Sequence, residues 1–296
     1  MNLKENIIHI RRNIKLFTKK FDLIIYSEYQ SDLNHTYKIT QQFSKKCNKI
    51  CYITSDQNDN KKNVEKKLNF SVEFFYISSG IFRTFVFNFL KSKFMILTLT
   101  DIDNNYLKKS KFVSNYIYIF HSITSTHMCY LEDAFDNYDV IFCVGKYQFK
   151  EIRKREKIYK LKPKKLLPYY HARIQTLRNL KNKNYNCKKK IIICSTWGKN
   201  SISETLDNDF LINLLEEKIE VFFQLHKMSL NRVNKLNIDL EKIKNQYEKF
   251  TFSYEYLSPK KLSEYSVMLS DWSGAATEFA FGFKRPVIFI DLKKKS

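Results

Sequence analysis

The stretch SDWSGAATEFAFG, residues 270–282, combines residue types that can hold a charged ligand. An apolar run ends at Asp271, and Ser273 and Gly274 then open a predicted helix. Backbone N–H groups, a hydroxyl and the positive end of a helix can together hold a phosphate. The same residues also fit an ordinary N-cap formed by Ser273. The stretch therefore predicts an anion site, a capped helix, or both.

Four more candidate residues in this half of the chain follow apolar runs. Thr196, Trp197 and Gly198 come directly after one run, where the chain must turn tightly. His226 ends the next run, and its imidazole can exchange a proton or donate to a phosphate. A lone histidine in such a position is more often structural.

The first half of the chain offers acids, bases and hydroxyls at corresponding positions. His121 follows the run YIYIF, with the hydroxyl of Thr124 and the imidazole of His127 close behind. Asp101 and Asp103 follow another apolar run. Acid and base groups in one half and a phosphate-type site in the other would suit group transfer.

Twelve short apolar runs must position these residues. They alternate with helix-compatible stretches, a pattern typical of βαβ units and of parallel sheets covered on both faces. The runs are 22–28, 49–56, 71–78, 93–101, 116–122, 139–145, 164–170, 191–196, 219–226, 250–255, 265–271 and 286–291. The predicted fold class is α/β, with two doubly wound parallel sheets, and ligands of such sheets bind at the carboxyl ends of the strands.

The basic segment NLKNKNYNCKKK, residues 179–190, separates the two series of runs. An interdomain connection is favoured over a nucleic-acid-binding arm. We expect an N-terminal domain over 1–185 and a C-terminal domain over 186–296. The second domain is short, which suggests a truncated or minimal version.

The composition excludes several classes of protein. The 296 residues are 44% apolar, which can fill real cores and argues against disorder. Lys91 and Lys93 interrupt the longest apolar stretch, 82–99, so a membrane-spanning helix is not expected. The start of the chain does not resemble a secretory signal, and we expect a cytoplasmic protein. The six scattered cysteines fit buried, reduced thiols rather than metal ligands.

The chain is strongly basic, with 52 Lys and Arg against 30 Asp and Glu, a net charge of +22. Nucleic acid, anionic membranes and phosphorylated substrates are all attracted by such a charge. An AT-rich genome would produce part of the same bias without selection for charge. The basic segment 149–165 can lie on anionic lipid as an amphipathic helix or form a solvated outer helix.

Several common enzyme motifs are missing. The sequence contains no G-x-G-x-x-G, Walker loop, G-x-S-x-G or H-E-x-x-H. Dinucleotide dehydrogenases, P-loop NTPases, α/β-hydrolases and zincins therefore lose their usual sequence support.

The candidate segments resemble, in order, those of the CDP-glycerol glycerophosphotransferase family. MLSDWSGAATEFAFGFKRPVIFID is similar to its most specific signature, and ICSTWG and FQLHKM resemble two shorter segments. IFHSITSTH and YYHARIQTL stand where the family has its acceptor segment and an arginine-containing segment. The resemblance covers about residues 90–292.

This resemblance implies a GT-B-like fold, with two Rossmann-like domains facing a cleft. It also implies transfer of a polyol phosphate from a CDP-activated donor to a hydroxyl of a cell-surface glycan or lipid-linked acceptor, releasing CMP. The enzyme would lie at the inner face of the membrane and need no cofactor, metal or nucleic acid.

The resemblance also assigns roles to individual residues. His121 would be the base on the acceptor hydroxyl, with His127 as the alternative, and Arg173 would support charge near the cleft. His226 would be a second catalytic residue beside the donor diphosphate. The other residues implied to bind or flank the donor are Thr196, Trp197, Gly198, Asp271, Ser273, Gly274 and Glu278, while the candidates on the acceptor side are Asp101, Asp103, Thr124, His127 and Arg173.

Two other functions remain open at this stage. A GT-B glycosyltransferase that uses a nucleotide sugar would have the same kind of cleft. A basic scaffold or nucleic-acid binder would explain the charge, but the sequence has no clustered module of aromatic and basic residues to support it.

Overall fold

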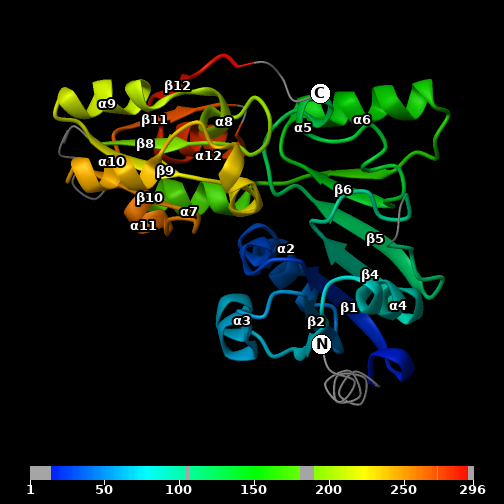
Figure 1. Ribbon diagram of the computed structural model, residues 1–296. Coiled ribbons are helices and arrows are strands. Elements are labelled where there is room, and N and C mark those ends of the chain that lie inside the picture. The colour runs from blue at the N-terminus through cyan, green and yellow to red at the C-terminus, as the bar shows by residue number, and fades with distance from the viewer. Residues whose placement is uncertain (1–14, 105–106, 181–189, 272, 293–296) are drawn as a thin grey trace. The chain divides into compact units, whose positions relative to one another are not determined.

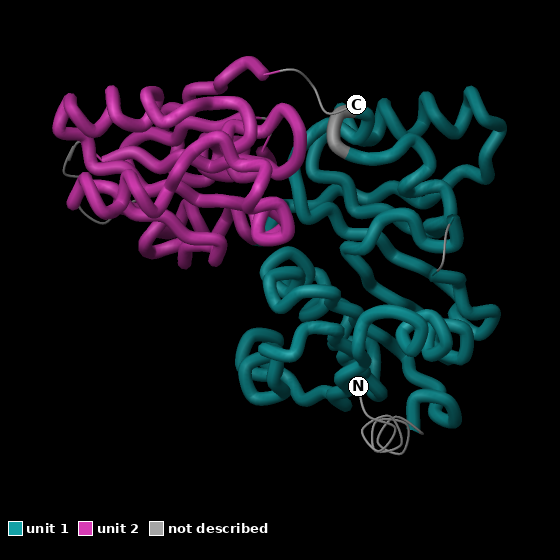
Figure 2. The backbone as a smooth tube through the Cα atoms, in the orientation of Figure 1, with its two compact units in different colours: residues 1–172 teal, residues 173–296 magenta. Residues whose placement is uncertain are grey.

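The computed structural model describes residues 15–104, 107–180, 190–271 and 273–292. The chain divides into two compact units, residues 1–172 and 173–296 (Figure 2). The sequence suggested a boundary after residue 185, whereas the two units meet after residue 172. Residues 181–189 of the basic segment lie outside the described residues.

Unit 1 is built on a parallel sheet of seven strands in the order β3-β2-β1-β4-β5-β6-β7 (Figure 1). The strands are β1 (Lys20–Ser27), β2 (Ile50–Thr54), β3 (Glu73–Tyr76), β4 (Lys91–Leu97), β5 (Val113–Ile119), β6 (Val140–Cys143) and β7 (Lys165–Pro168). Each of them overlaps a run expected from the sequence. The order reverses at β1 and β4, the position at which such sheets bind ligands.

Helices cover both faces of this sheet, which explains why its strands are almost continuously apolar. On β1, Leu23 and Ile25 pack on one side, while Ile24 and Tyr26 pack on the other. The first side is covered by α2 (Leu33–Ser44) and α3 (Lys61–Leu68), and the second by α4 (Ile81–Phe89) and α6 (Lys146–Ile158). The short helices η1 (Gln30–Asp32) and α5 (Thr126–Cys129) lie in loops.

Unit 2 repeats the design with five parallel strands in the order β10-β9-β8-β11-β12. The strands are β8 (Lys190–Cys194), β9 (Glu220–Gln224), β10 (Phe250–Ser253), β11 (Val267–Ser270) and β12 (Val287–Phe289). The helices are α7 (Ala172–Leu180), α8 (Ile202–Thr205), α9 (Asn208–Glu216), η2 (Lys227–Lys235), α10 (Leu240–Gln246), α11 (Pro259–Leu262) and α12 (Gly274–Phe283). The prediction of two doubly wound parallel sheets is confirmed.

Helix α7 packs in unit 2, although the sequence assigned it to the first domain. The buried Leu177 joins the core beneath α12, and a Cβ on Gly282 would come within 2.6 Å of the Leu177 Cβ. Only glycine allows so close an approach. Arg178 also donates to the Phe281 carbonyl over 3.1 Å, so α7 is fixed along α12 at two points.

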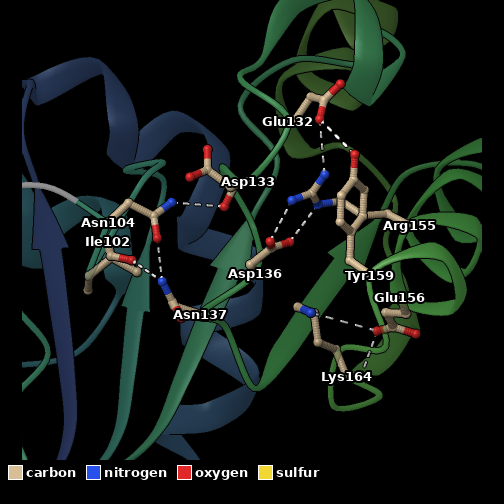
Figure 3. A network of polar contacts seen from close by, with 10 residues as sticks. All are labelled: Ile102, Asn104, Glu132, Asp133, Asp136, Asn137, Arg155, Glu156, Tyr159 and Lys164. Carbon is tan, nitrogen blue, oxygen red and sulfur yellow. Dashed lines mark hydrogen bonds and ion pairs between the residues drawn. The ribbon is translucent and has the colours of Figure 1, made fainter.

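The basic segment 149–165 is anchored to unit 1 by a polar network (Figure 3). Arg155 makes two hydrogen bonds of 2.7 Å to the Asp136 carboxylate and stacks over the Tyr159 ring. The Tyr159 hydroxyl in turn donates to Glu132 over 3.0 Å. The network as drawn comprises Ile102, Asn104, Glu132, Asp133, Asp136, Asn137, Arg155, Glu156, Tyr159 and Lys164.

A second part of the network holds the turn after α6. Lys164 is buried with its Nζ 3.9 Å from Glu156, which also accepts the Lys164 N–H. Burial lowers the pKa of Lys164. The segment thus contains an anchored helix whose exposed lysines include Lys150, Lys154 and Lys157. Its binding to lipid stays a prediction.

None of the helices in the described part of the chain has both the length and the hydropathy needed to cross a bilayer.

Candidate active site

A pocket opens in unit 2 at the carboxyl ends of β8, β9 and β11. Its lining includes Ser195 after β8, His226 after β9, and Ser273 and Ala275 after β11. β8 and β11 are neighbours at the centre of the sheet, where the strand order reverses. Ligands of open parallel sheets bind at this reversal point, so the pocket lies where the fold favours one.

Asp271 holds the loop that follows β8, which contributes Ser195 to the lining of this pocket. Asp271 is 1% exposed, and its carboxylate accepts from the Thr196 N–H, the Thr196 hydroxyl and the Ile202 N–H, all at 3.0 Å. A carboxylate buried in this way cannot also meet a phosphate, which it would repel. The structure therefore gives Asp271 a positioning role, in place of the direct phosphate contact that the resemblance implied.

The loop that Asp271 holds contains three of the predicted residues. Gly198 has φ +90°, a backbone conformation that residues with a side chain rarely adopt, and it allows the tight turn after Thr196. The Gly198 carbonyl accepts from the Ser201 N–H over 3.0 Å, which closes the turn. Trp197 is 39% exposed, and its ring centroid lies 6.3 Å from that of His226.

His226 is held in one orientation by the backbone that follows it. Its Nδ1 accepts from the Met228 N–H over 3.1 Å, at the start of η2. A neutral imidazole that accepts at Nδ1 carries its proton on Nε2. His226 is thus arranged as an N–H donor through Nε2.

Ser273 is the N-cap of α12, as the sequence allowed. Its hydroxyl accepts from the Ala275 N–H over 3.2 Å, and Thr277 donates to the Gly274 carbonyl over 2.8 Å. Ser273 and Ala275 also line the pocket, so the positive end of the ten-residue helix borders it. Capping and proximity to a ligand pocket are compatible here.

An ion pair between Arg173 and Glu278 forms another wall of the pocket. Arg173 on α7 donates from Nε to the Glu278 carboxylate on α12. Burial raises the pKa of Glu278, and the neighbouring guanidinium opposes this effect. Arg173 belongs to unit 2, and a role for it toward the acceptor stays a prediction. Among the described residues that line the pocket, Glu278 is the sole carboxylate, and a metal-free reaction stays a prediction.

In unit 1, His121 lies exposed after β5, near two histidines that sequence reasoning missed. Its ring centroid is 6.3 Å from that of His35 on α2, and the His35 centroid is 5.1 Å from that of His171, after β7. His35 and His171 are buried. His35, His121 and His171 each lie after the carboxyl end of a strand of the same sheet. Their positions after three apolar runs of the sequence could have identified them together.

His127 and Thr124 belong to a loop that Glu151 of α6 holds. Glu151 accepts from the Thr126 N–H and hydroxyl, both over 2.7 Å, and lies 3.5 Å from the His127 Nδ1. The Thr124 hydroxyl contacts that of Ser122 at 3.0 Å. The Glu151 carboxylate therefore fixes the loop at the start of α5, which is a structural role. The His127 side chain is mostly exposed.

Asp101 and Asp103 shape the loop after β4. Both have positive φ, 62° and 70°, which aspartate tolerates better than most residues. Asp101 accepts from the Thr100 hydroxyl over 2.6 Å, and Asp103 accepts from the Lys109 N–H over 3.3 Å. These contacts are those of turn residues, and a role toward an acceptor stays a prediction.

Asp32, the last residue of η1 directly before α2, gives unit 1 a predicted pH dependence. Burial raises its pKa from 3.8 to about 6 despite the N–H groups of Glu28 and Tyr29 that donate to it. Because the pKa of this carboxyl is higher in the folded than in the unfolded protein, the free energy of unfolding falls as the pH rises from about 4 to above 6. Asp32→Asn keeps an acceptor oxygen and should raise the free energy of unfolding at pH 7 by about 1–3 kcal/mol, with little effect at pH 4.

The free energy of unfolding is measured with urea at both pH values. Asp22→Asn is the control, and it should lower the free energy of unfolding at pH 7 where Asp32→Asn raises it. The N–H groups of Lys49 and Asn48 hold the pKa of Asp22 below its usual value. Its carboxylate therefore stabilises the fold at neutral pH, and this contribution is lost as the pH falls through the folded pKa. An Asp32→Asn protein less stable than the unmodified chain at pH 7 would contradict the prediction.

The chain is similar to known proteins in its fold, not detectably in its sequence. No protein-family model matches the chain, and no curated protein is detectably similar to it in sequence. Among solved structures, the wall teichoic acid polymerase TagF, soaked with CDPG, superposes with a TM-score of 0.60 at 14% identity, covering 97% of this chain and 76% of that chain.

Two further similar structures are UDP-N-acetylglucosamine 2-epimerases. The enzyme from Neisseria meningitidis, bound to UDP-GlcNAc, gives a TM-score of 0.60 at 10% identity, covering 93% of this chain and 84% of that chain. A putative enzyme from Listeria monocytogenes gives 0.59 at 11%, covering 93% and 80%. The chain therefore has the GT-B-like fold that a teichoic acid polymerase and nucleotide-sugar epimerases share.

Proposed function

We propose that this chain is a transferase that moves a polyol phosphate, of the glycerol phosphate type, from a CDP-activated donor to a hydroxyl. One observation carries the proposal: the Asp271-anchored loop, the oriented His226 and the start of α12 lie together at the reversal point of the unit 2 sheet. Such an arrangement of N–H and hydroxyl donors suits a diphosphate. The likeness to TagF supports CDP as the nucleotide.

In the proposed reaction, an acceptor oxygen attacks the phosphorus that carries the polyol. A new P–O bond forms, the bond to the bridging oxygen of the diphosphate breaks, and CMP leaves with the negative charge. His121 takes the proton of the acceptor hydroxyl. Desolvation by the protein around its ring lowers the pKa of His121, which keeps the imidazole neutral and able to accept a proton at neutral pH.

The residues of unit 2 would stabilise the leaving CMP. The His226 Nε2–H donates to a phosphate oxygen, and the N-terminus of α12 supplies partial positive charge. Glu278, oriented by Arg173, would contact the ribose or the base. No step requires a metal or another cofactor. The acceptor would be a glycan or lipid-linked chain at the inner face of the membrane.

A nucleotide-sugar glycosyltransferase is the second candidate. The specific support is the fold shared with enzymes that bind UDP-GlcNAc, at a TM-score equal to that for TagF. In that case the same donors would hold the diphosphate, and the uracil would replace the cytosine.

Calorimetric titration with CDP-glycerol and with UDP-GlcNAc tests the donor. We expect CDP-glycerol to bind, and His226→Ala to weaken binding by roughly 10- to 100-fold, as the loss of one N–H donor to a charged group implies. Lys227→Ala is the matched control, because Lys227 is adjacent but exposed and paired with Glu255 at 3.0 Å.

The reaction itself is tested by incubating labelled CDP-glycerol and a lipid-linked acceptor with the protein. We expect release of CMP and label on the acceptor. Binding of UDP-GlcNAc alone would favour the second candidate. If no CDP-polyol yields CMP or transferred label, the transferase proposal fails.

A further inference from the structure

A stripe of large apolar side chains lies exposed on α4 of unit 1. Ile81, Phe85 and Phe89 stand four residues apart, so they share one face of the helix, and they are 91%, 52% and 41% exposed. The opposite side of α4 contributes the fully buried Val86 and Phe87 to the core. The exposed stripe is therefore additional to what folding requires.

Two other aromatic residues extend this stripe. The ring centroid of Phe17 lies 5.8 Å from that of Phe85 and 6.0 Å from that of Phe89. Phe112, 55% exposed, precedes β5, and its backbone carbonyl accepts from the Ser92 N–H at the start of β4. We call Phe17, Ile81, Phe85, Phe89 and Phe112 the aromatic stripe.

Lysines border the aromatic stripe along the amino ends of three adjacent strands. Lys20 of β1 lies opposite Lys91 of β4 in the parallel register, and the Lys91 Nζ is 5.7 Å from the Phe112 ring centroid. Lys111 lies next to Phe112, and Lys15 lies two residues before Phe17. We call Lys15, Lys20, Lys91 and Lys111 the lysine rim.

Acidic residues are missing from the segments that form this surface. Residues 15–21, 81–94 and 107–115 contain three Lys or Arg each and no Asp or Glu. Carboxylates elsewhere in unit 1 pair with Lys19, Arg83 and Lys109. Among the described residues, no ion pair involves a member of the lysine rim, so no carboxylate of these residues neutralises its charge.

We propose that the aromatic stripe and the lysine rim form a docking surface for an anionic lipid bilayer. Phenyl and aliphatic side chains enter the acyl boundary, and lysines beside them meet the phosphate headgroups. A symmetric second copy fits less well, because a two-fold contact through this face would bring one lysine rim close to the other. The surface differs from the basic segment 149–165, whose exposed lysines include Lys150, Lys154 and Lys157 on α6.

Co-sedimentation with vesicles of phosphatidylcholine, with and without phosphatidylglycerol, tests the proposal. We expect binding that requires the anionic lipid. The rim variant Lys20→Ser/Lys91→Ser/Lys111→Ser should bind roughly a hundredfold more weakly, as about 1 kcal/mol per lysine implies. The stripe variant Ile81→Ser/Phe85→Ser should lose about tenfold or more, because its apolar area no longer leaves water.

The matched control is Lys150→Ser/Lys154→Ser/Lys157→Ser on α6, which removes the same charge and should retain binding. The single variant Ile81→Ser, at an almost fully exposed position, provides a stripe change that leaves the core intact. Unchanged binding by the stripe variants, loss in the α6 variant alone, or indifference to lipid charge would overturn the proposal. So would a dimer that the stripe variants dissociate in the absence of lipid. The assay contains no nucleotide, so its outcome is independent of the proposed reaction.

Discussion

Replacing Asp271 by alanine is expected to lower the free energy of unfolding of unit 2 by about 3 kcal/mol or more, because hydrogen bonds to a buried charged group contribute roughly 1.5–3 kcal/mol each. The variant leaves the N–H groups of Thr196 and Ile202 without their acceptor. The loop after β8 would then lose its fixed shape, and CDP-glycerol binding should weaken with it. Urea unfolding and calorimetry measure the two effects.

Asp239→Ala is the matched control for this variant. Asp239 caps α10 by accepting one backbone N–H, from Lys242 at 3.1 Å, and its loss should cost about 1 kcal/mol. Asp271→Asn keeps the volume but turns an amide toward donors, so an intermediate loss is expected. If Asp271→Ala bound the donor normally, its role in shaping the site would be wrong.

Replacing His121 by alanine is expected to reduce CMP release by about 10²- to 10⁴-fold, the usual effect of losing a general base. Binding of CDP-glycerol should change little, because His121 belongs to unit 1 and the donor pocket is in unit 2. Initial rates at saturating donor separate the chemical step from binding.

His127→Ala is the control, since His127 is mostly exposed and lies beside Glu151 in a loop with its own anchor. It should retain activity within about threefold, the range expected of a surface substitution away from the reacting atoms. The opposite result, a deep loss in His127→Ala and near-normal rates in His121→Ala, would transfer the role of base to His127.

The sequence predicts the twelve strands because each lies in a short apolar run, and the central strands of a doubly wound sheet are buried on both faces. β2 illustrates this, since all five residues of ICYIT are buried. The same periodicity cannot show which unit a connecting helix joins. The sequence gives no sign that α7 packs on α12, because the contact of Leu177 with Gly282 depends on the close approach of two helices far apart in the chain.

The candidate site was predictable in its residues more than in their roles. Thr196, His226, Asp271 and Ser273 follow strand ends, and parallel strands bring their carboxyl ends to one edge. The hydrogen bonds of the structure then distinguish what each of these residues does. Asp271 faces backbone donors and His226 accepts at Nδ1, two facts set by loop conformations that no residue pattern encodes.

The anchor of the site also bears on how unit 2 folds during synthesis. Asp271 and Thr196 are 75 residues apart, and β8 pairs with β11 across a similar interval. Contacts of such long sequence separation form late, because closing a long loop costs entropy before any bond compensates for it. A growing chain that ends before β11 can pair β8, β9 and β10 but cannot build the ligand pocket. The proposed nucleotide binding would therefore begin only once β11 and α12 have left the ribosome and β11 has paired with β8.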